Sequence, residues 1–327
     1  MTSTHPYEGL MPEVILSAVE RLGMRCTGGL LALNSYENRV YRVDTEVPGR
    51  LAVKFYRPGR WTDAQISEEH AFLLELAEQE IPVVAPAPGP TGSTLCHHAG
   101  FSYAVFPWQP GRASELGTME ERHMLGRFLG RIHRAGATRG FRARPPLDVG
   151  TYGREPVRFL LEHGFLPNYL EQVYHTLASE LVERVAAVID TVSARVLRLH
   201  GDCHLGNLLW TDTGPHFVDF DDCCMGPAVQ DLWMLLSGDR DAMQRQLAEV
   251  LEGYTAFMDF NIAELALIEP LRTLRLIHYS AWLARRWDDP AFPRSFPWFN
   301  TTRYWEDQVL SLREQQALMD EPPLSVA

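Results

Sequence analysis

The residues with the clearest chemical pattern lie in one short segment, residues 200–207, which reads HGDCHLGN. Asp219 follows twelve residues after Asn207. Phosphoryl transfer from a nucleotide needs magnesium to neutralise the phosphates and a carboxylate to orient and deprotonate the acceptor hydroxyl. Asp202 supplies such a carboxylate, while Asn207 and Asp219 supply two hard oxygen donors. The pattern therefore indicates phosphoryl transfer to a hydroxyl group.

The spacing of these residues also matches a known loop. Asp202 and Asn207 are separated like the Asp and Asn of the protein-kinase loop H-R-D-x-x-x-x-N, which a D-F-G aspartate follows. The chain resembles the aminoglycoside phosphotransferase branch of the protein-kinase-like fold, whose loop reads H-G-D-x-x-x-x-N before a D-x-D-like strand end. Three further blocks resemble bacterial serine/threonine protein kinases of this family: residues 34–41 (NSYENRVY), 53–58 (VKFYRP) and 226–233 (GPAVQDLW).

The resemblance runs from about Leu33 to Pro323 and implies both an activity and partners. It implies an ATP-dependent serine/threonine protein kinase of the bacterial stress response, with ATP and Mg²⁺ as cofactors. The expected partner is a protein substrate with a serine or threonine acceptor, and a monomer is expected. Two alternatives stay open: a kinase of the same fold for amino alcohols or aminoglycosides, and a nucleotide-binding regulator without turnover.

The resemblance also implies roles for individual residues. Asp202 is expected to accept the proton of the substrate hydroxyl. Asp219 is expected to join it in the catalytic centre and to bind magnesium together with Asn207. Ser35 is expected to contact the nucleotide phosphates, and the segment from Phe106 to Trp108 is expected to offer backbone groups to adenine.

Lys54 closes a strand-like segment, LAVK, that corresponds to the V-A-I-K segment of kinases. In kinases this lysine bridges the α- and β-phosphates and is held by a helix glutamate. We expect Glu69 to be that glutamate, because apolar residues follow it at helical offsets of three, four and seven. Its neighbour Glu68 remains the alternative.

Three departures from protein-kinase patterns shape the expectations. No G-x-G-x-x-G precedes the lysine; residues 34–38 take its place, and the Ser35 hydroxyl is expected to compensate for missing backbone N–H groups. Gly201 replaces the H-R-D arginine, and residues 219–231 are too few for a long activation loop, so loop phosphorylation is not expected. Asp221 stands at the D-F-G glycine, which predicts a preformed site.

The elements that must position these residues begin with strands. Residues 38–43 and 51–56 predict a hairpin, and residues 101–106 predict another strand. Residues 67–80 predict a helix that ends before Pro82. A capping-box pattern at Thr118 begins a second helix. The later expectations are helices over 179–192, 241–260 and 263–287 and short strands over 196–199 and 216–219.

These elements predict an α+β, two-lobed, protein-kinase-like fold. A small antiparallel sheet lobe, residues 1–107, is expected to bind the nucleotide. A larger, mainly helical lobe, residues 108–327, is expected to carry the catalytic loop. The boundary is expected near Pro107–Ser114, where the composition changes, and ATP is expected between the lobes.

Composition restricts the class of protein. The 327 residues include 46% hydrophobic and 22% charged residues, enough for a sizeable core. Acidic residues outnumber basic ones by 42 to 30, whereas dense contact with nucleic acid needs the opposite balance. No apolar run approaches the about 18 residues of a membrane span, and residues 1–6 lack signal-peptide features. We therefore expect a cytoplasmic protein that binds neither nucleic acid nor a membrane.

Other interpretations compete at the loop itself. Asp and Asn residues are common in ordinary surface turns, so residues 200–219 could be such a loop. Asp221 and Asp222 could join the metal site, although a structural role is favoured for at least one of them. Asp231 is expected to anchor the loop from a buried helix, and His200 is expected to brace it.

The five cysteines have irregular spacing, so reduced thiols are expected rather than disulfides. A zinc site is disfavoured, because the candidate ligands Cys203-His204 and Cys223-Cys224 are adjacent pairs and adjacent residues rarely both reach one ion. A redox-sensitive thiol beside the loop is the more plausible alternative.

Two further groups of residues have an open interpretation. A cluster of arginine residues could dock an acidic peptide, although a solvated helix end and loop is favoured. It contains Arg131, Arg134, Arg139, Arg142 and Arg144. The aromatic-rich stretch could wall an acceptor pocket, although core packing is favoured. It contains Tyr279, Trp282, Trp287, Phe292, Phe296, Trp298, Phe299, Tyr304 and Trp305.

Overall fold

The computed structural model describes residues 6–113 and 115–326 of the chain. Residues Met1–His5, on which part of the signal-peptide expectation rests, and Ser114, at the end of the predicted boundary, lie outside this described part. The first elements are α1 (Pro12–Glu20), β1 (Cys26–Ala32), β2 (Arg39–Thr45), β3 (Arg50–Phe55), α2 (Asp63–Glu78), β4 (Cys96–His98) and β5 (Phe101–Pro107). We call this group, α1 to β5, the sheet lobe.

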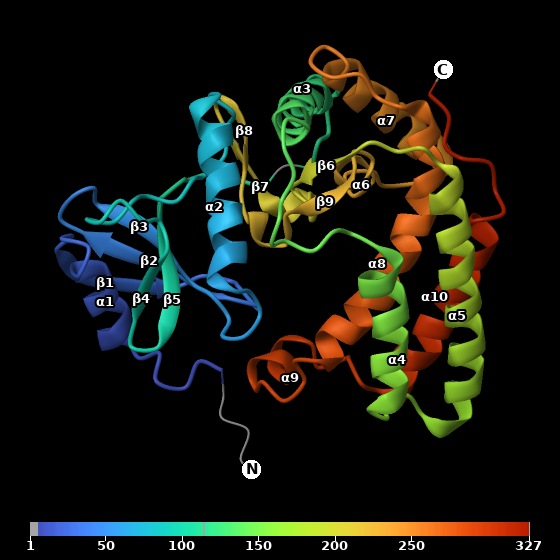
Figure 1. Cartoon of the computed structure of the whole chain (residues 1–327), viewed down its shortest axis with the longest axis horizontal. Coiled ribbons are helices and arrows are strands. Elements are labelled where there is room, and N and C mark those ends of the chain that lie inside the picture. The colour runs from blue at the N-terminus through green and yellow to red at the C-terminus, as the bar shows by residue number, and fades with distance from the viewer. Residues whose placement is uncertain (1–5, 114, 327) are drawn as a thin grey trace.

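The helical lobe comprises the elements from α3 onward (Figure 1). Its helices are α3 (Met119–Gly136), α4 (Glu155–Glu162), α5 (Asn168–Thr191), α6 (Gln230–Trp233), α7 (Arg240–Tyr254), α8 (Ile268–Ala284), α9 (Ala291–Ser295) and α10 (Thr302–Leu318). Its short strands are β6 (Val196–Leu199), β7 (Leu208–Thr211), β8 (Gly214–Phe217) and β9 (Cys224–Pro227). The arrangement confirms the predicted α+β fold class, with a small antiparallel sheet beside a larger helical region.

The sheet lobe is built on five antiparallel strands in the order β1-β2-β3-β5-β4. The predicted hairpin is confirmed as β2 and β3, with Val43 opposite Leu51. Both side chains are buried, because one face of the sheet packs on α1. Strand β1 was missed: its sequence CTGGLLA holds two glycines, and its alternation of buried and exposed residues is weak.

Helix α2 lies between the sheet and the helical lobe (Figure 1). It begins with a capping box, in which the Thr62 hydroxyl accepts the Gln65 N–H and the Gln65 side chain returns to the Thr62 N–H. Its apolar side chains Phe72, Leu73 and Leu76 are buried in a core that continues into the helical lobe. Because Glu69 precedes them at helical offsets, it lies on the same packed face.

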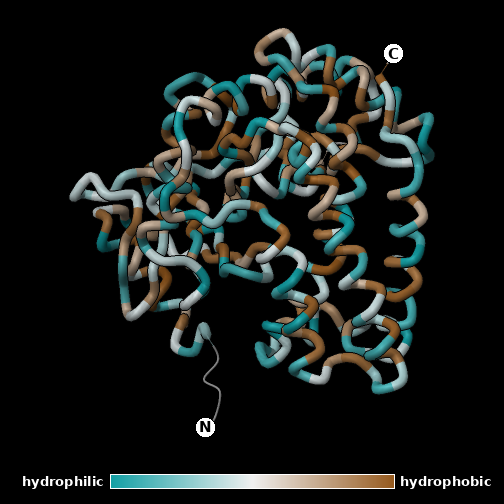
Figure 2. The backbone as a smooth tube through the Cα atoms, turned by 45° about the vertical axis from the view of Figure 1, so that its right-hand side comes forward, coloured by the Kyte–Doolittle hydropathy of each residue, from teal (hydrophilic) through white to brown (hydrophobic). Residues whose placement is uncertain are grey.

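The helical lobe has two packed regions. Helices α3 and α7 share one core with α2, while α4, α5, α8 and α10 share a second. Figure 2 shows hydrophobic and hydrophilic residues alternating along these helices, as expected where one face of each helix is buried. Two predicted helices had wrong bounds: residues 179–192 are only the end of α5, and residues 262–267 form a 3₁₀ turn that precedes α8.

Two pairs of short strands frame the HGD segment. Strand β6 ends at Leu199, directly before His200, and β7 begins at Leu208, directly after Asn207. The strand predicted over 216–219 is instead β8, which ends at Phe217, so Asp219 lies in the turn beyond it. Within residues 6–113 and 115–326, no helix has the length and apolarity needed to cross a membrane.

Candidate active site

A cavity of about 850 Å³ lies between the two lobes. The sheet lobe lines it with residues 33–38 and with β3 and β5, and the helical lobe lines it with the HGD segment and with α8. All eight residues that the sequence nominated for the site line this one cavity: Ser35, Lys54, Glu69, Phe106, Trp108, Asp202, Asn207 and Asp219. The Ser35 hydroxyl there accepts the N–H of Val40 at 3.1 Å, which shapes the segment that replaces a glycine-rich loop.

The HGD segment is anchored from beneath, as expected for Asp231. This fully buried carboxylate accepts the N–H of His200 at 2.8 Å and the N–H of Gly201 at 2.9 Å. The His200 ring is also buried and contacts the carbonyl oxygen of Val218 at 2.9 Å, so it braces the segment as predicted. These bonds fix the backbone from which Asp202 projects.

The Asp202 carboxylate lies between two basic side chains. Arg275 Nη1 from α8 is 2.6 Å from Oδ1, and His204 Nε2 is 3.4 Å from Oδ2. Burial opposes ionisation, but the hydrogen bond with His204 and the charge of Arg275 outweigh it and hold the pKa of Asp202 well below its usual range. Asp202 is therefore ionised at neutral pH.

Asn207 and Asp219 form a donor set that suits magnesium. The Asn207 side-chain nitrogen donates to the Asp202 carbonyl oxygen at 2.9 Å, so its amide oxygen is the end available to a cation. Asp219 has a left-handed backbone (φ 59°) and a side chain that is 56% exposed. Amide and carboxylate oxygens are the ligands that Mg²⁺ prefers, with substrate phosphates completing the shell.

The lysine in β3 faces three carboxylates. Lys54 Nζ lies 2.9 Å from Asp221 Oδ1, 3.3 Å from Asp219 Oδ1 and 3.4 Å from Glu69 Oε1. Burial alone would lower the pKa of Lys54, but the surrounding carboxylates raise it well above its ordinary value. The lysine is therefore a fixed positive charge at the floor of the cavity.

The geometry also distinguishes the two candidate glutamates. Glu69 lies beside Lys54 and pairs with Arg144 Nη2 at 2.8 Å through its other oxygen. Glu68 points elsewhere and accepts the N–H groups of Arg142, Ala143 and Arg144, which holds its pKa below the usual range. Glu69, and not Glu68, is therefore the partner of the lysine.

Sequence reasoning missed Arg60, which reaches into the cavity from the turn between β3 and α2. Its guanidinium forms an ion pair with Asp221 and lies 2.5 Å from Asp222 Oδ1. Burial would raise the pKa of Asp221, but Arg60 and Lys54 hold it well below the usual range. Asp221 therefore links two cations, which fits the structural role favoured for at least one of Asp221 and Asp222, although its partners are side chains rather than backbone N–H groups.

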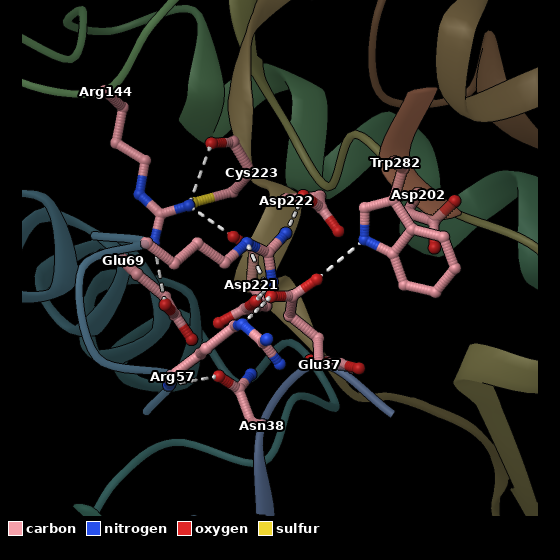
Figure 3. Close-up of polar contacts among 12 residues, drawn as sticks. Glu37, Asn38, Arg57, Glu69, Arg144, Asp202, Asp221, Asp222, Cys223 and Trp282 are labelled. Atoms are coloured by element: carbon pink, nitrogen blue, oxygen red, sulfur yellow. Dashed lines mark hydrogen bonds and ion pairs between the residues drawn. The ribbon is translucent and has the colours of Figure 1, made fainter. Parts of the chain in front are cut away.

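Glu37 was also missed, and it joins the segment that replaces the glycine-rich loop to the helical lobe. Figure 3 shows its carboxylate pointing toward the Trp282 indole, whose Nε1 donates to it at 2.6 Å. Arg286 of the segment after α8 forms an ion pair with the same carboxylate, and Arg57 Nε lies 3.6 Å from it. The Tyr36 ring packs on Phe296, with 4.8 Å between ring centroids.

Comparisons with known proteins identify the family of the chain. The sequence pattern described as the phosphotransferase enzyme family (APH) matches residues 30–268. The chain belongs to this family. The activity class is therefore phosphoryl transfer, which agrees with what the residues predicted.

Full-length relatives of this phosphotransferase include Stress response kinase A of Escherichia coli (strain K12), 46% identical over 99% of this chain and 98% of the relative. Serine/threonine protein kinase RdoA of Salmonella typhimurium (strain LT2) is 45% identical over 98% of this chain and 97% of the relative. The fold is similar to that of an amicoumacin kinase solved with AMP-PNP, Ca²⁺ and Ami, with a TM-score of 0.75 and 17% identity over 96% of this chain and 94% of that one.

Neither cysteine alternative is supported in the phosphotransferase. Among the described residues, no three His, Cys, Asp or Glu side chains form a group that could hold a metal ion. Cys203, Cys223 and Cys224 are free thiols and buried. Burial raises the pKa of each, so the reactive thiolate is suppressed and a redox role beside the loop is not favoured.

The arginine cluster and the aromatic stretch were the other two groups whose role was open. Arg144 is buried against Glu69, so the favoured solvated position is wrong for this arginine, whereas Arg139 is 59% exposed and its Nη2 lies 2.6 Å from Glu75. The aromatic stretch is also divided. Phe292, Phe299 and Trp305 are core residues, as favoured from the sequence. Tyr279, Trp282 and Phe296 line the cavity.

Proposed function

We propose that the phosphotransferase is an ATP-dependent serine/threonine protein kinase of the bacterial stress response. The main support is that Asp202, Lys54, Asn207 and Asp219 line one cavity between the lobes. Two relatives that cover nearly the whole chain have the names stress response kinase and serine/threonine protein kinase. The enzyme acts as a monomer in the cytoplasm on a protein substrate, and uses neither nucleic acid nor a membrane.

The nucleotide binds at the inner side of the cavity. Lys54, held by Glu69 at 3.4 Å, binds the α- and β-phosphates. Ser35, in the segment that replaces the glycine-rich loop, also contacts the phosphates. Backbone groups of the segment from Phe106 to Trp108 receive adenine. We place the lobe boundary after Pro107, so that residues 1–107 bind the nucleotide and residues 108–327 carry the catalytic loop.

Asp202 performs the proton transfer. Its ionised carboxylate accepts the proton of the acceptor hydroxyl as the oxygen attacks the γ-phosphorus and ADP leaves. Asn207 and Asp219 hold Mg²⁺, which when bound neutralises the negative charge on the phosphates. Arg60 and Lys54 keep the turn after Asp219 in place, so the metal site needs no rearrangement before the nucleotide binds.

The small-molecule alternative is not favoured. A deep acidic pocket in the helical lobe would have supported a cationic amino alcohol or aminoglycoside. Instead, the carboxylates at the acceptor end are paired with arginines: Asp202 with Arg275, and Asp222 with Arg60. A regulator without turnover is also disfavoured, because base, lysine and metal donors are all present.

Transfer of label from γ-labelled ATP tests the proposal, with wild type and Asp202→Asn compared at equal nucleotide saturation. The acceptors are a general protein substrate and, separately, amino alcohols and aminoglycosides. We expect label on protein serine or threonine, reduced about 10²–10⁴-fold in the variant as is typical for loss of a positioned base. Label only on a small molecule contradicts the proposal. Nucleotide binding without transfer to any acceptor supports a regulator.

A further inference from the structure

One face of helix α8 forms the acceptor side of the cavity. Arg275, His278, Tyr279 and Trp282 all line it. Their spacing of i, i+3, i+4 and i+7 places them on a single face of the helix. Arg275 contacts the carboxylate of Asp202 directly, so this face lies where an acceptor hydroxyl must approach the base.

Arg275 differs from the other cations of the cavity. Lys54 is buried, the Arg60 side chain is only 12% exposed, and both lie among the acidic side chains of the inner site. The Arg275 side chain is 41% exposed and contacts Asp202 through Nη1. A guanidinium has five N–H donors, so Arg275 can bind a second carboxylate from solvent while it stays beside the base.

The charged side chains that act on His278, one turn from Arg275, are arginines. The His278 ring stacks on Tyr152, with 4.4 Å between centroids. Burial and the four nearby arginines together lower the pKa of His278 to about 3, so the ring is neutral at physiological pH. Tyr279 and Trp282 stack on each other at 5.6 Å and add an apolar surface one turn along the helix.

We propose that this face of α8 selects serine or threonine acceptors that are flanked by an acidic residue. The flanking carboxylate binds the Arg275 guanidinium, and the adjoining part of the peptide packs on Tyr279 and Trp282. The inference deepens the proposed protein-kinase function and rests on it.

Charge pairing explains why an anionic neighbour suits the reaction. A carboxylate binds a guanidinium through two parallel hydrogen bonds, whereas a lysine at the same place would meet a positive charge. Arg275 keeps its Nη1 contact with Asp202 while its other N–H groups bind the peptide carboxylate, so Asp202 stays in position to accept the hydroxyl proton. The acceptor oxygen then forms its bond to the γ-phosphorus, the bond to the ADP oxygen breaks, and the proton ends on Asp202.

The test compares two peptides that each hold one serine, flanked either by glutamates or by lysines. We expect wild type to favour the glutamate peptide in kcat/KM by about tenfold or more, the size of one charge-assisted hydrogen bond. Arg275→Gln should abolish the preference, and Arg275→Glu should reverse it. The measured quantity is the ratio of kcat/KM for the two peptides, because a general loss of Asp202 function would lower both values alike and leave the ratio unchanged.

A matched control makes the same charge change elsewhere. Arg303 of α10 has a side chain that is 90% exposed, so Arg303→Glu should keep the wild-type ratio. Equal kcat/KM for the two peptides in wild type overturns this inference alone, because phosphorylated peptide still supports a protein kinase. A wild-type preference that survives in Arg275→Glu also overturns it. Folded wild type that labels neither peptide nor any protein overturns both proposals.

Discussion

Arg144 Nη2 lies 2.8 Å from Glu69 Oε2, and both side chains are buried. Glu69 uses its other oxygen to face Lys54 at 3.4 Å. Arg144 also donates to the backbone carbonyl of Cys223 at 3.4 Å, beyond the turn that follows Asp219. One arginine of the helical lobe therefore holds the glutamate of α2 and the turn after Asp219 in a common position, without a phosphorylated activation loop.

Replacing Arg144 by alanine should destabilise the protein strongly. The change leaves the Glu69 carboxylate buried without its arginine, which typically costs about 3–5 kcal/mol of unfolding free energy. Urea unfolding of Arg144→Ala against wild type measures this loss. Arg154→Ala is the control, because Arg154 and Glu183 are 53% and 64% exposed and such pairs contribute about 0–1 kcal/mol. Equal small losses in both variants would contradict the role given to Arg144.

Gly201 should not tolerate any side chain. Its φ is 84°, and a Cβ there would lie 2.2 Å from the carbonyl oxygen of Asp222. Gly201→Ala should therefore shift the turn after Asp219 and reduce both stability and transfer rate. Gly164 is a useful control because its φ is 64° and a Cβ would meet nothing within 4 Å.

Gly164→Ala should cost about 1–2 kcal/mol from backbone strain and leave the transfer rate unchanged. Urea unfolding and kcat for both variants measure the difference. If Gly201→Ala had the same unfolding free energy and kcat as Gly164→Ala, the close approach of Gly201 to the Asp222 carbonyl oxygen would not be what excludes a side chain at position 201. The close approach of Gly201 to the Asp222 carbonyl oxygen also explains why the arginine of the H-R-D pattern cannot occupy position 201.

Several of the residues that line the cavity could be predicted from the sequence because their patterns are local. Asp202 and Asn207 belong to one eight-residue segment, and Lys54 ends an apolar strand pattern. Glu69 follows from helical periodicity alone, since its apolar neighbours must face the core. In each case, residues close together in the chain indicate both the chemical group and the secondary structure that positions it.

The charges that surround the site could not be predicted, because their partners are distant in the chain. Arg275 is 73 positions from Asp202, and Trp282 is 245 positions from Glu37. No period or motif connects such residues, so only the packing of α8 against the other elements brings them together. Arg144 belonged to the cluster of arginines noted in the sequence. No local pattern distinguishes this buried arginine from Arg139, which is exposed.

Asp231 should control the position of the HGD segment rather than bind the nucleotide. It is fully buried and accepts the N–H groups of His200 and Gly201, and His133 Nε2 lies 3.0 Å away. Asp231→Ala leaves these donors without a partner, at about 1–3 kcal/mol for each buried group. We expect lower stability and a much lower kcat, with ATP affinity kept in the folded fraction.

Asp231→Asn is the conservative variant of this test. It retains one oxygen acceptor and should recover part of the stability and part of kcat. ATP binding by calorimetry, urea unfolding and single-turnover transfer separate the three effects. A wild-type kcat in Asp231→Ala would show that the segment holds its shape without this anchor.

The pH dependence should report the contact between Arg275 and Asp202. Burial opposes ionisation of Asp202, but His204 and Arg275 hold its pKa below the ordinary value of about 3.9. A carboxyl whose pKa is lowered in the folded state adds stability above its unfolded pKa and loses it as pH falls through the folded value. Asp202 is thus ionised throughout the neutral range, so in wild type its protonation should lower kcat/KM only at strongly acidic pH.

Arg275→Gln removes one of the two groups that stabilise the ionised carboxylate. The pKa of Asp202 should rise, and the acidic limb of kcat/KM should move to higher pH, while Arg303→Gln should leave the profile in place. The stability lost by Arg275→Gln should be larger at pH 7 than near pH 3, where the unfolded carboxyl is mostly protonated. Profiles of kcat/KM and urea unfolding at both pH values measure this. Superimposable wild-type and Arg275→Gln profiles would mean that His204 alone keeps the base ionised.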